Sequence, residues 1–247
     1  MALELVDFLQ GSFSLIFVII SLIIGLSILL KYREFKSRVY ILVGLSWIGL
    51  ANPWIPDSIN FIMLLFSENS LPAPIYFIIG NVFLPFFFIC WLTAFTELTY
   101  KDKQFLIVGL FAVLSIIFEI IFFILLFTDI DAIGILRRPF LVEFGPLITI
   151  YLIIFIVVLL VTGILFARKS LNSENEEVKL KGKLLLAAFL SFSIGAIFDS
   201  MLGGLLDYTD PLLPILVVII RIVLISSAVE FYGGFILPKW MKKFFLE

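Results

Sequence analysis

Three charged residues lie inside long apolar stretches of the chain, where an unpaired charge is costly. Arg221 falls within the stretch 213–237, Asp199 within the stretch before it, and Glu119 within an earlier one. A charged side chain at membrane depth usually pairs with an opposite charge or faces a polar interior. Counting residues from the ends of the stretches places all three at comparable depth in the outer half of the membrane. We therefore predict a cluster of Arg221 and Asp199, with Glu119 as a candidate third member.

Two carboxylates against one guanidinium leave this cluster with a surplus acid, which must be protonated, bind a cation or meet water. The cluster can therefore be a ligand or ion site, or it can be a structural pair that fixes helix register. Glu230 lies nine residues after Arg221 and points to nearly the opposite side of the same helix. We expect Glu230 to snorkel or to pair with an inner lysine, the alternative being an inner gate or proton site.

Asp199 belongs to a row of small and polar residues at strict four-residue spacing. The row consists of Ser191, Gly195, Asp199 and Gly203. Residues at this spacing share one side of a helix, and small residues there allow another helix to approach closely. We therefore expect Asp199 to face protein and not lipid.

Further polar candidates lie where the second and third apolar stretches approach the outer half. They are Asn52, Trp54, Asp57 and Asn81. An Asn-Pro break in a membrane helix frees carbonyl groups that need cover, and such breaks often line cavities. The alternative is a loop turn that Asn and Asp side chains cap.

The elements that must position these residues are membrane helices. The 247 residues are 62% apolar and 15% charged, with a mean hydropathy of +1.21, whereas soluble domains are about 45–50% apolar and about 25% charged. The apolar runs are long and continuous and do not alternate, which favours helices over a barrel. The predicted fold is all-α: a single polytopic seven-helix bundle over 1–247 in the plasma membrane. The helices are expected over 11–30, 39–56, 74–95, 104–127, 145–166, 184–206 and 213–237, followed by an interfacial tail over 238–247.

The second helix contains Pro53 and Pro56, which a regular helix cannot accommodate without a kink or a break. The stretch 39–66 is also too long for one upright crossing. Either the helix kinks at the prolines, or it ends there and 58–66 lies in the interface. We prefer the second interpretation.

The distribution of basic residues predicts the orientation. When the loops are assigned alternately to two sides, every Lys and Arg except Arg137, Arg138 and Arg221 falls on one side. Basic loops stay cytoplasmic, which places the N-terminus outside and the C-terminus inside. The loop Ala167–Lys183 and the tail 238–247 are the surfaces on which we expect a cytoplasmic partner, in addition to the lipid bilayer itself.

The residue types that are missing argue against an enzyme. The chain has no histidine, the commonest metal ligand and general base, and a single cysteine, Cys90, which excludes an intramolecular disulfide. It also lacks a glycine-rich phosphate loop, a Gly-x-Gly-Asp protease motif and a lysine in its last apolar stretch for retinal. We expect no catalytic residue, metal, cofactor or nucleic acid.

The stretch 76–103, with Gly80, Pro85 and the run WLTAFTELTYK, resembles the third helix of the seven-helix membrane sensory region found at the N-terminus of some histidine kinases. The resemblance covers helices two to four. It implies that the bundle senses a signal outside the cell or within the membrane. No kinase sequence follows Glu247, so any output is expected to pass through a separate partner. The Phe-, Ile- and Lys-rich composition without histidine also suits a prokaryotic, including an archaeal, membrane protein.

These observations predict a receptor-like sensor that binds a small or lipidic ligand in the outer half of the bundle and signals through its cytoplasmic loops. A ligand can do so only if it binds two states of the bundle unequally. One alternative is a small ion- or proton-coupled transporter or channel that uses Glu119, Asp199 and Glu230 as carboxylate stations. Another is a structural scaffold subunit in which the charges only specify packing.

Overall fold

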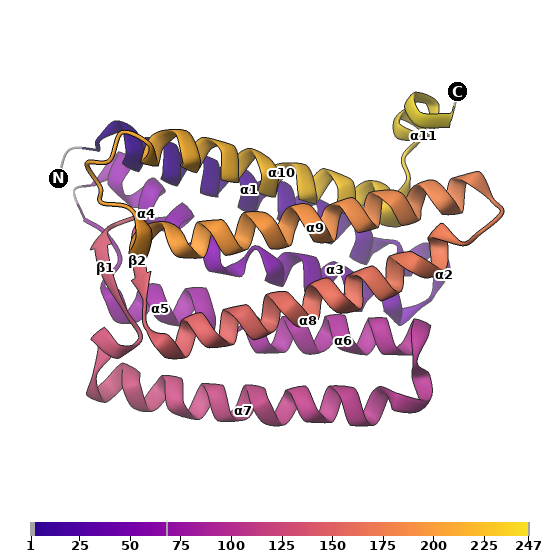
Figure 1. Ribbon diagram of the computed structural model, residues 1–247, viewed down its shortest axis with the longest axis horizontal. Helices are drawn as coiled ribbons and strands as arrows, with labels where there is room; N and C mark the ends of the chain where they lie inside the picture. The colour runs from indigo at the N-terminus through magenta and orange to yellow at the C-terminus, as the bar shows by residue number, and fades with distance from the viewer. Residues whose placement is uncertain (1–2, 68, 247) are drawn as a thin grey trace.

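In the computed structural model, which describes residues 3–67 and 69–246, seven helical stretches are long and apolar enough to cross a membrane (Figure 1). This confirms the predicted helical architecture and the number of spans. The spans are formed by α1 (Leu5–Leu30) with α2 (Tyr32–Phe35); α3 (Arg38–Leu50), η1 (Asn52–Trp54) and α4 (Ile55–Phe66); α5 (Ala73–Asn81) and α6 (Leu84–Thr99); η2 (Lys101–Lys103) and α7 (Gln104–Thr128); α8 (Pro146–Leu171); α9 (Glu176–Leu205); and α10 (Leu213–Ile236).

The two ends of the bundle differ in what they carry. The N-terminus, the α4–α5 connection, a β-hairpin and the α9–α10 connection gather at one end, which we call the hairpin end (Figure 1). Helix α2, the α6–α7 and α8–α9 connections and α11 (Lys239–Leu246) gather at the other, which we call the basic end because most of the lysines and arginines lie there. The charge asymmetry predicted from the loops therefore follows the long axis of the bundle.

The second span continues past the prolines. Proline has no N–H, so Pro53 and Pro56 cannot donate to the carbonyls of Gly49 and Asn52, and the chain passes through a 3₁₀ turn, η1, before helix resumes at Ile55. The preferred interpretation, a helix that ends at Pro56, differs from the structure because helix resumes at Ile55, while the placement of 58–66 in the interface stays a prediction. The alternative, a helix broken by a kink, describes the structure. Helix α4, the part of the span after the kink, packs against α1.

The third span is also broken, between α5 and α6. Pro85 cannot donate to the carbonyl of Asn81, and the helix is interrupted at Val82 and Phe83. The Asn81 amide donates to the carbonyl of Phe77, 2.9 Å away, within its own helix. Both interrupted spans thus break near the hairpin end, and irregular backbone at membrane depth is tolerated where protein or a cavity covers it.

A β-hairpin replaces the loop that was expected between the fourth and fifth helices. Strands β1 (Gly134–Arg138) and β2 (Leu141–Phe144) pair antiparallel, with Gly134 opposite Phe144 and a register shift between Leu136 and Arg138. The Asn60 amide of α4 donates to the carbonyl of Pro139 at the hairpin turn, 2.7 Å away. Strand β2 packs against α9, so the hairpin forms part of the wall of the bundle and is not a free loop.

The polar segment 167–183 is mostly helical. Helix α8 extends to Leu171 and α9 begins at Glu176, where the Asn175 side chain caps it by accepting from the backbone N–H of Glu177 at 2.9 Å. The tail forms α11, in which Met241 packs against Leu180 and Leu237. These helical ends project from the basic end (Figure 1).

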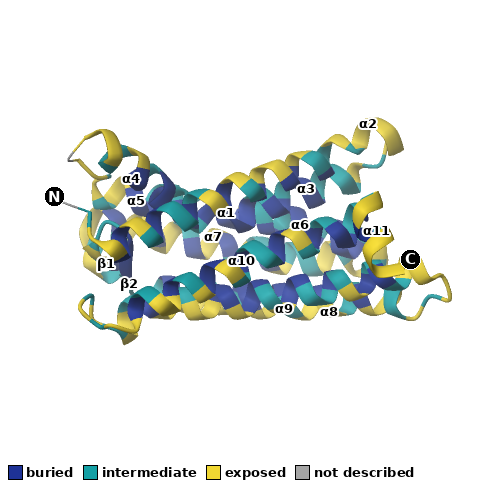
Figure 2. Ribbon diagram, turned by 90° about the horizontal axis from the view of Figure 1, so that it is seen from above, coloured by how far each residue is buried: buried dark blue, intermediate teal, exposed yellow. Residues whose placement is uncertain are grey.

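Whether a residue is buried depends on which face of its helix it occupies. Inward faces are buried and outward faces are exposed, as Figure 2 shows. Helix α7 lies at the edge of the bundle and exposes a row of large apolar side chains. They include Phe105, Leu106, Leu110, Val113, Ile117 and Ile120. Lipid tails are as apolar as leucine, so such a surface suits a bilayer.

Candidate ligand-binding site

Arg221 is the centre of a buried polar cluster near the hairpin end. Its side chain lies on α10 and is only 2% exposed. Nη1 donates to Oδ2 of Asp199 on α9 at 3.0 Å, and Nη2 lies 3.8 Å from Oδ2 of Asp57 on α4. The predicted pairing of Arg221 with Asp199 is therefore present, and Asp199 faces protein as its four-residue spacing indicated.

Asp57 is the second acid of the cluster. Asp57 is 5% exposed, and its Oδ1 accepts a 2.6 Å hydrogen bond from the Tyr76 hydroxyl of α5. Oδ2 accepts from Ser14 of α1 at 3.4 Å. Sequence reasoning treated Asp57 as secondary and singled out neither Tyr76 nor Ser14. A signal for Ser14 was available, because Asp7, Gln10, Ser14 and Ser21 recur at helical spacing on one buried face of α1.

The break in the second span supplies two more members. Trp54 of η1 donates its indole N–H to Oδ2 of Asp199 at 2.7 Å, and the Arg221 guanidinium carbon lies 5.8 Å from the centre of the Trp54 ring, within cation–π range. The Asn52 amide donates to the carbonyls of Ile79 and Gly80 at 2.8 and 3.0 Å. Asn52 thus links the break in the second span to the end of α5, beside the break in the third span. Trp54 contacts Asp199 directly.

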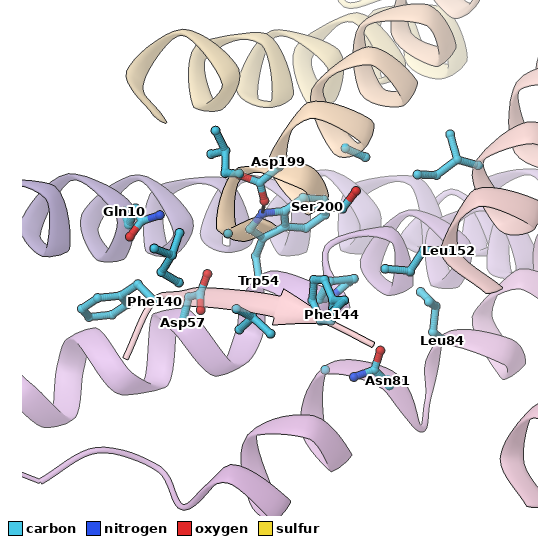
Figure 3. Close-up of a pocket in the computed structure, with 18 of the residues that line it drawn as sticks. Gln10, Trp54, Asp57, Asn81, Leu84, Phe140, Phe144, Leu152, Asp199 and Ser200 are labelled. Carbon is cyan, nitrogen blue, oxygen red and sulfur yellow. Dashed lines mark hydrogen bonds between the residues drawn. The ribbon is translucent and has the colours of Figure 1, made fainter. Parts of the chain in front are cut away.

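A cavity opens onto this cluster (Figure 3). It contains about 870 Å³ of space not filled by atoms, including the part open to the surroundings. Arg221, Asp57 and Asp199 supply its charges, and β2 and the hairpin turn supply one wall through Phe140 to Val142 and Phe144. The remaining surface is mostly apolar and includes the aromatic rings of Trp54, Tyr76, Phe155 and Phe192. An apolar cavity with a few converging polar groups is the usual form of a small-molecule site.

Glu119 does not belong to the cluster, which corrects its candidate place there. Helix α7 packs mainly against α6 and α8 and lies away from α10, and Glu119 does not line the cavity. Its Oε2 is buried without a hydrogen-bond partner among the described residues. Counting residues predicts a depth for Glu119, but depth carries no information about which side of the bundle a helix occupies.

Glu230 also lies outside the cavity. Its Oε1 accepts a 2.7 Å hydrogen bond from Ser226 one turn earlier on α10, and its Oε2 is buried without a partner in the part of the chain that the structure describes. The expected pairing with an inner lysine is therefore not the arrangement found. Lys181 of α9 donates to the carbonyl of Phe235 at 3.5 Å.

A second polar network closes the hairpin end. Asp7 of α1 is fully buried, and its Oδ2 accepts from Arg138 of β1 at 2.6 Å, from the Tyr208 hydroxyl at 3.0 Å and from the backbone N–H of Glu4 at 3.2 Å. The Arg138 guanidinium stacks 3.7 Å from the centre of the Tyr208 ring. This network fastens the hairpin to α1 and to the α9–α10 connection.

Two members of this second network, Arg138 and Tyr208, have raised pKa values. Partial burial lowers the pKa of the Arg138 guanidinium, but the hydrogen bond and the charge of Asp7 outweigh that effect and raise the pKa above its usual value. Burial raises the pKa of the Tyr208 hydroxyl, and the hydrogen bond to Asp7 raises it further. Arg138 therefore stays a cation and Tyr208 stays a donor across the physiological pH range.

Replacing Asp7 with alanine is expected to destabilise the protein by about 1.5–3 kcal/mol, because the charged acceptor of three hydrogen bonds is removed from a buried position. Thermal unfolding of the purified protein in detergent measures the change. The matched control is Glu143→Ala, which removes the acid of the exposed ion pair with Arg137 and should cost about 1 kcal/mol or less. Equal effects of the two substitutions would contradict a fastening role for Asp7.

Comparison of the chain with protein-family models, with curated proteins and with solved structures finds no match in any of the three.

Proposed function

We propose that the protein is a receptor-like membrane protein that binds a small or lipidic ligand in the cavity beside Arg221. The observation that carries the proposal is the cavity itself. It reaches a buried guanidinium and two carboxylates and is otherwise lined largely by aromatic and aliphatic side chains. The resemblance of 76–103 to the sensory region of some histidine kinases agrees with this function and stays a prediction.

The proposed orientation in the plasma membrane places the hairpin end outside and the basic end in the cytoplasm. The gathering of lysine and arginine at the basic end supports it, because basic segments are retained on the cytoplasmic side. In this orientation the cavity is reached from the outer half of the bundle. The ends of α8 and α9 and the helix α11 are then the surfaces for a cytoplasmic partner.

The cluster offers a physical route from ligand to output. A ligand shifts a conformational equilibrium only if it binds the two states with different affinity. Asp199 on α9 and Arg221 on α10 meet at the cavity, and the same two helices continue to the basic end, where Gly233 and Gly234 of α10 leave room for Met241 of α11 and Leu185 of α9. A ligand that binds Asp199 more tightly in one arrangement of α9 and α10 than in another would thereby bias the contact between these helices.

Filling the cavity tests the proposal. Ser200 lines the cavity on α9, whereas Phe198 on the same helix is exposed. A ligand present at a hundred times its Kd should raise the Tm of the wild-type protein by roughly 5–10 °C. We expect Ser200→Trp to abolish that rise and Phe198→Trp to keep it, in thermal-shift measurements against a library of small amphiphiles. A rise that survives Ser200→Trp, or a library without any stabilising member, contradicts a ligand site here.

The transporter alternative has less support. It needs Glu119, Asp199 and Glu230 to act as successive stations, but of these three only Asp199 lines the cavity. Flux in liposomes that collapses in Asp199→Asn would nevertheless favour transport over sensing.

A further inference from the structure

We propose that the ligand of the cavity is a small organic cation, a protonated amine joined to an apolar body, whose ammonium group binds Asp199. This inference rests on the ligand-binding function proposed above and restricts the ligand to molecules that carry a positive charge. It is carried by the balance of charges in the cavity, by a carboxylate oxygen that has no donor, and by the aromatic wall.

The charges that line the cavity favour a cation. Two carboxylates, Asp57 and Asp199, lie there with a single basic residue, Arg221. Arg221 donates to Asp199 through Nη1 and lies within 3.8 Å of Asp57, while its Nε has no hydrogen-bond partner among the described residues. A cationic ligand would balance the second carboxylate, whereas an anionic ligand would add a third acidic group beside a single guanidinium.

Asp199 presents the acceptor that an ammonium group needs. Its Oδ2 accepts from the Trp54 indole and from Arg221, both of which can only donate, so Asp199 acts as an acceptor. Its Oδ1 receives no hydrogen bond from the described residues, and the side chain is 16% exposed on the cavity wall. An N–H donor from a ligand can reach this oxygen without displacing either existing bond.

Gln10 of α1 provides a second polar contact in the cavity. The residue is 2% exposed and lines the cavity, and its Oε1 has no hydrogen-bond partner among residues 3–67 and 69–246. Figure 3 shows Gln10 on the same side of the cavity as Phe140. A buried amide oxygen without a donor is costly, so a ligand that brings an N–H or O–H to it is favoured.

The walls favour an organic cation over a metal ion. No group of three or more Cys, Asp or Glu side chains that could hold a metal occurs in the described part of the chain. The cavity wall instead carries several aromatic rings, whose faces attract organic cations and whose edges pack against apolar groups. The rings are those of Trp54, Tyr76, Phe140, Phe144, Phe155 and Phe192.

A series of probes that differ only in charge tests the inference on the wild-type protein. The probes are 3-phenylpropylamine, 3-phenylpropanol and 3-phenylpropanoate, titrated calorimetrically into detergent-solubilised protein at pH 7. We expect the amine to bind at least about tenfold more tightly than the alcohol, because the alcohol can donate a hydrogen bond to Asp199 but carries no positive charge to pair with it. We expect no measurable binding of the propanoate.

Two substitutions assign the binding to the cavity. Asp199→Asn should weaken the amine by at least about tenfold, while Glu119→Gln, which neutralises a membrane carboxylate outside the cavity, should leave the affinity unchanged. Gln10→Met, which keeps the cluster charges, should weaken the amine by a smaller factor. If Asp199→Asn does not fold, the charge series on the wild-type protein and Gln10→Met still decide the question.

Each outcome has one meaning. Preferential binding of the amine that Asp199→Asn abolishes supports the inference. Propanoate or alcohol binding as tightly as the amine, with sensitivity to Ser200→Trp, overturns the cationic ligand but leaves the proposed ligand-binding function standing. Amine binding that survives Asp199→Asn also overturns the assignment to Asp199. Failure of all three probes overturns the cationic inference, and only the library experiment with Ser200→Trp then decides on the function.

Discussion

Replacing Arg221 with methionine is expected to destabilise the folded bundle by about 3–5 kcal/mol, the range for removing one partner of a buried ion pair. The guanidinium is 2% exposed and lies between two acids, at 3.0 Å from Asp199 and 3.8 Å from Asp57. After the substitution both carboxylates stay in the interior without a cation. Unfolding by titration with a denaturing detergent, followed by circular dichroism, measures the loss.

Two further variants separate charge from shape at this position. The triple variant in which Asp57→Asn and Asp199→Asn accompany Arg221→Met should recover much of the lost stability, because no uncompensated charge remains. Arg137→Met, which breaks an exposed ion pair, should change stability by about 1 kcal/mol or less. If Arg221→Met were as mild as Arg137→Met, the cluster would not be the buried charge centre that the geometry indicates.

Replacing Gly203 with alanine is expected to destabilise the protein by about 1–3 kcal/mol, the usual range for overpacking. A Cβ atom at this position of α9 would lie 2.0 Å from the carbonyl oxygen of Val142 and 3.2 Å from the backbone nitrogen of Glu143. Strand β2 must therefore move away from α9, which also displaces one wall of the cavity. Hydrogen exchange of residues 134–144 should increase together with the fall in Tm.

The neighbouring glycine is a matched control. Nothing lies within 4 Å of a Cβ atom at Gly204 on the same helix. Gly204→Ala should therefore stabilise the protein by about 0.5–1 kcal/mol through the higher helix preference of alanine. The two substitutions add the same methyl group one residue apart, so their opposite signs isolate the contact with β2. Similar effects would show that the hairpin does not rest on α9.

The sequence predicted the helices and one contact of the site for a clear reason. Helix periodicity gives the direction of a residue around its own axis, which is why the four-residue row correctly turned Asp199 toward protein. Residue counting gives depth, which brought Asp199 and Arg221 to the same level. Neither gives the position of one helix around another, and Glu119 was therefore placed with Arg221 although α7 lies at the edge of the bundle.

Asp57 was predicted only as a secondary candidate and the hairpin was not predicted, because the local context of both pointed elsewhere. Asp57 follows two prolines, which favoured a turn at the helix end, yet those prolines only bend the chain and leave Asp57 buried on α4. The hairpin has strands of five and four residues within a charged connection, too short for a clear alternating pattern. Its position over the cavity depends on Asn60 and Asp7, whose partners are distant in sequence.

The two acids of the buried cluster are synthesised before the arginine that neutralises them. Asp57 belongs to the second span and Asp199 to the sixth, whereas Arg221 belongs to the seventh. Synthesis from the N-terminus delivers both acids to the translocon before their counter-ion has left the ribosome. A chain that ends before Leu213 therefore contains Asp57 and Asp199 without Arg221, the cation that lies between them in the folded bundle.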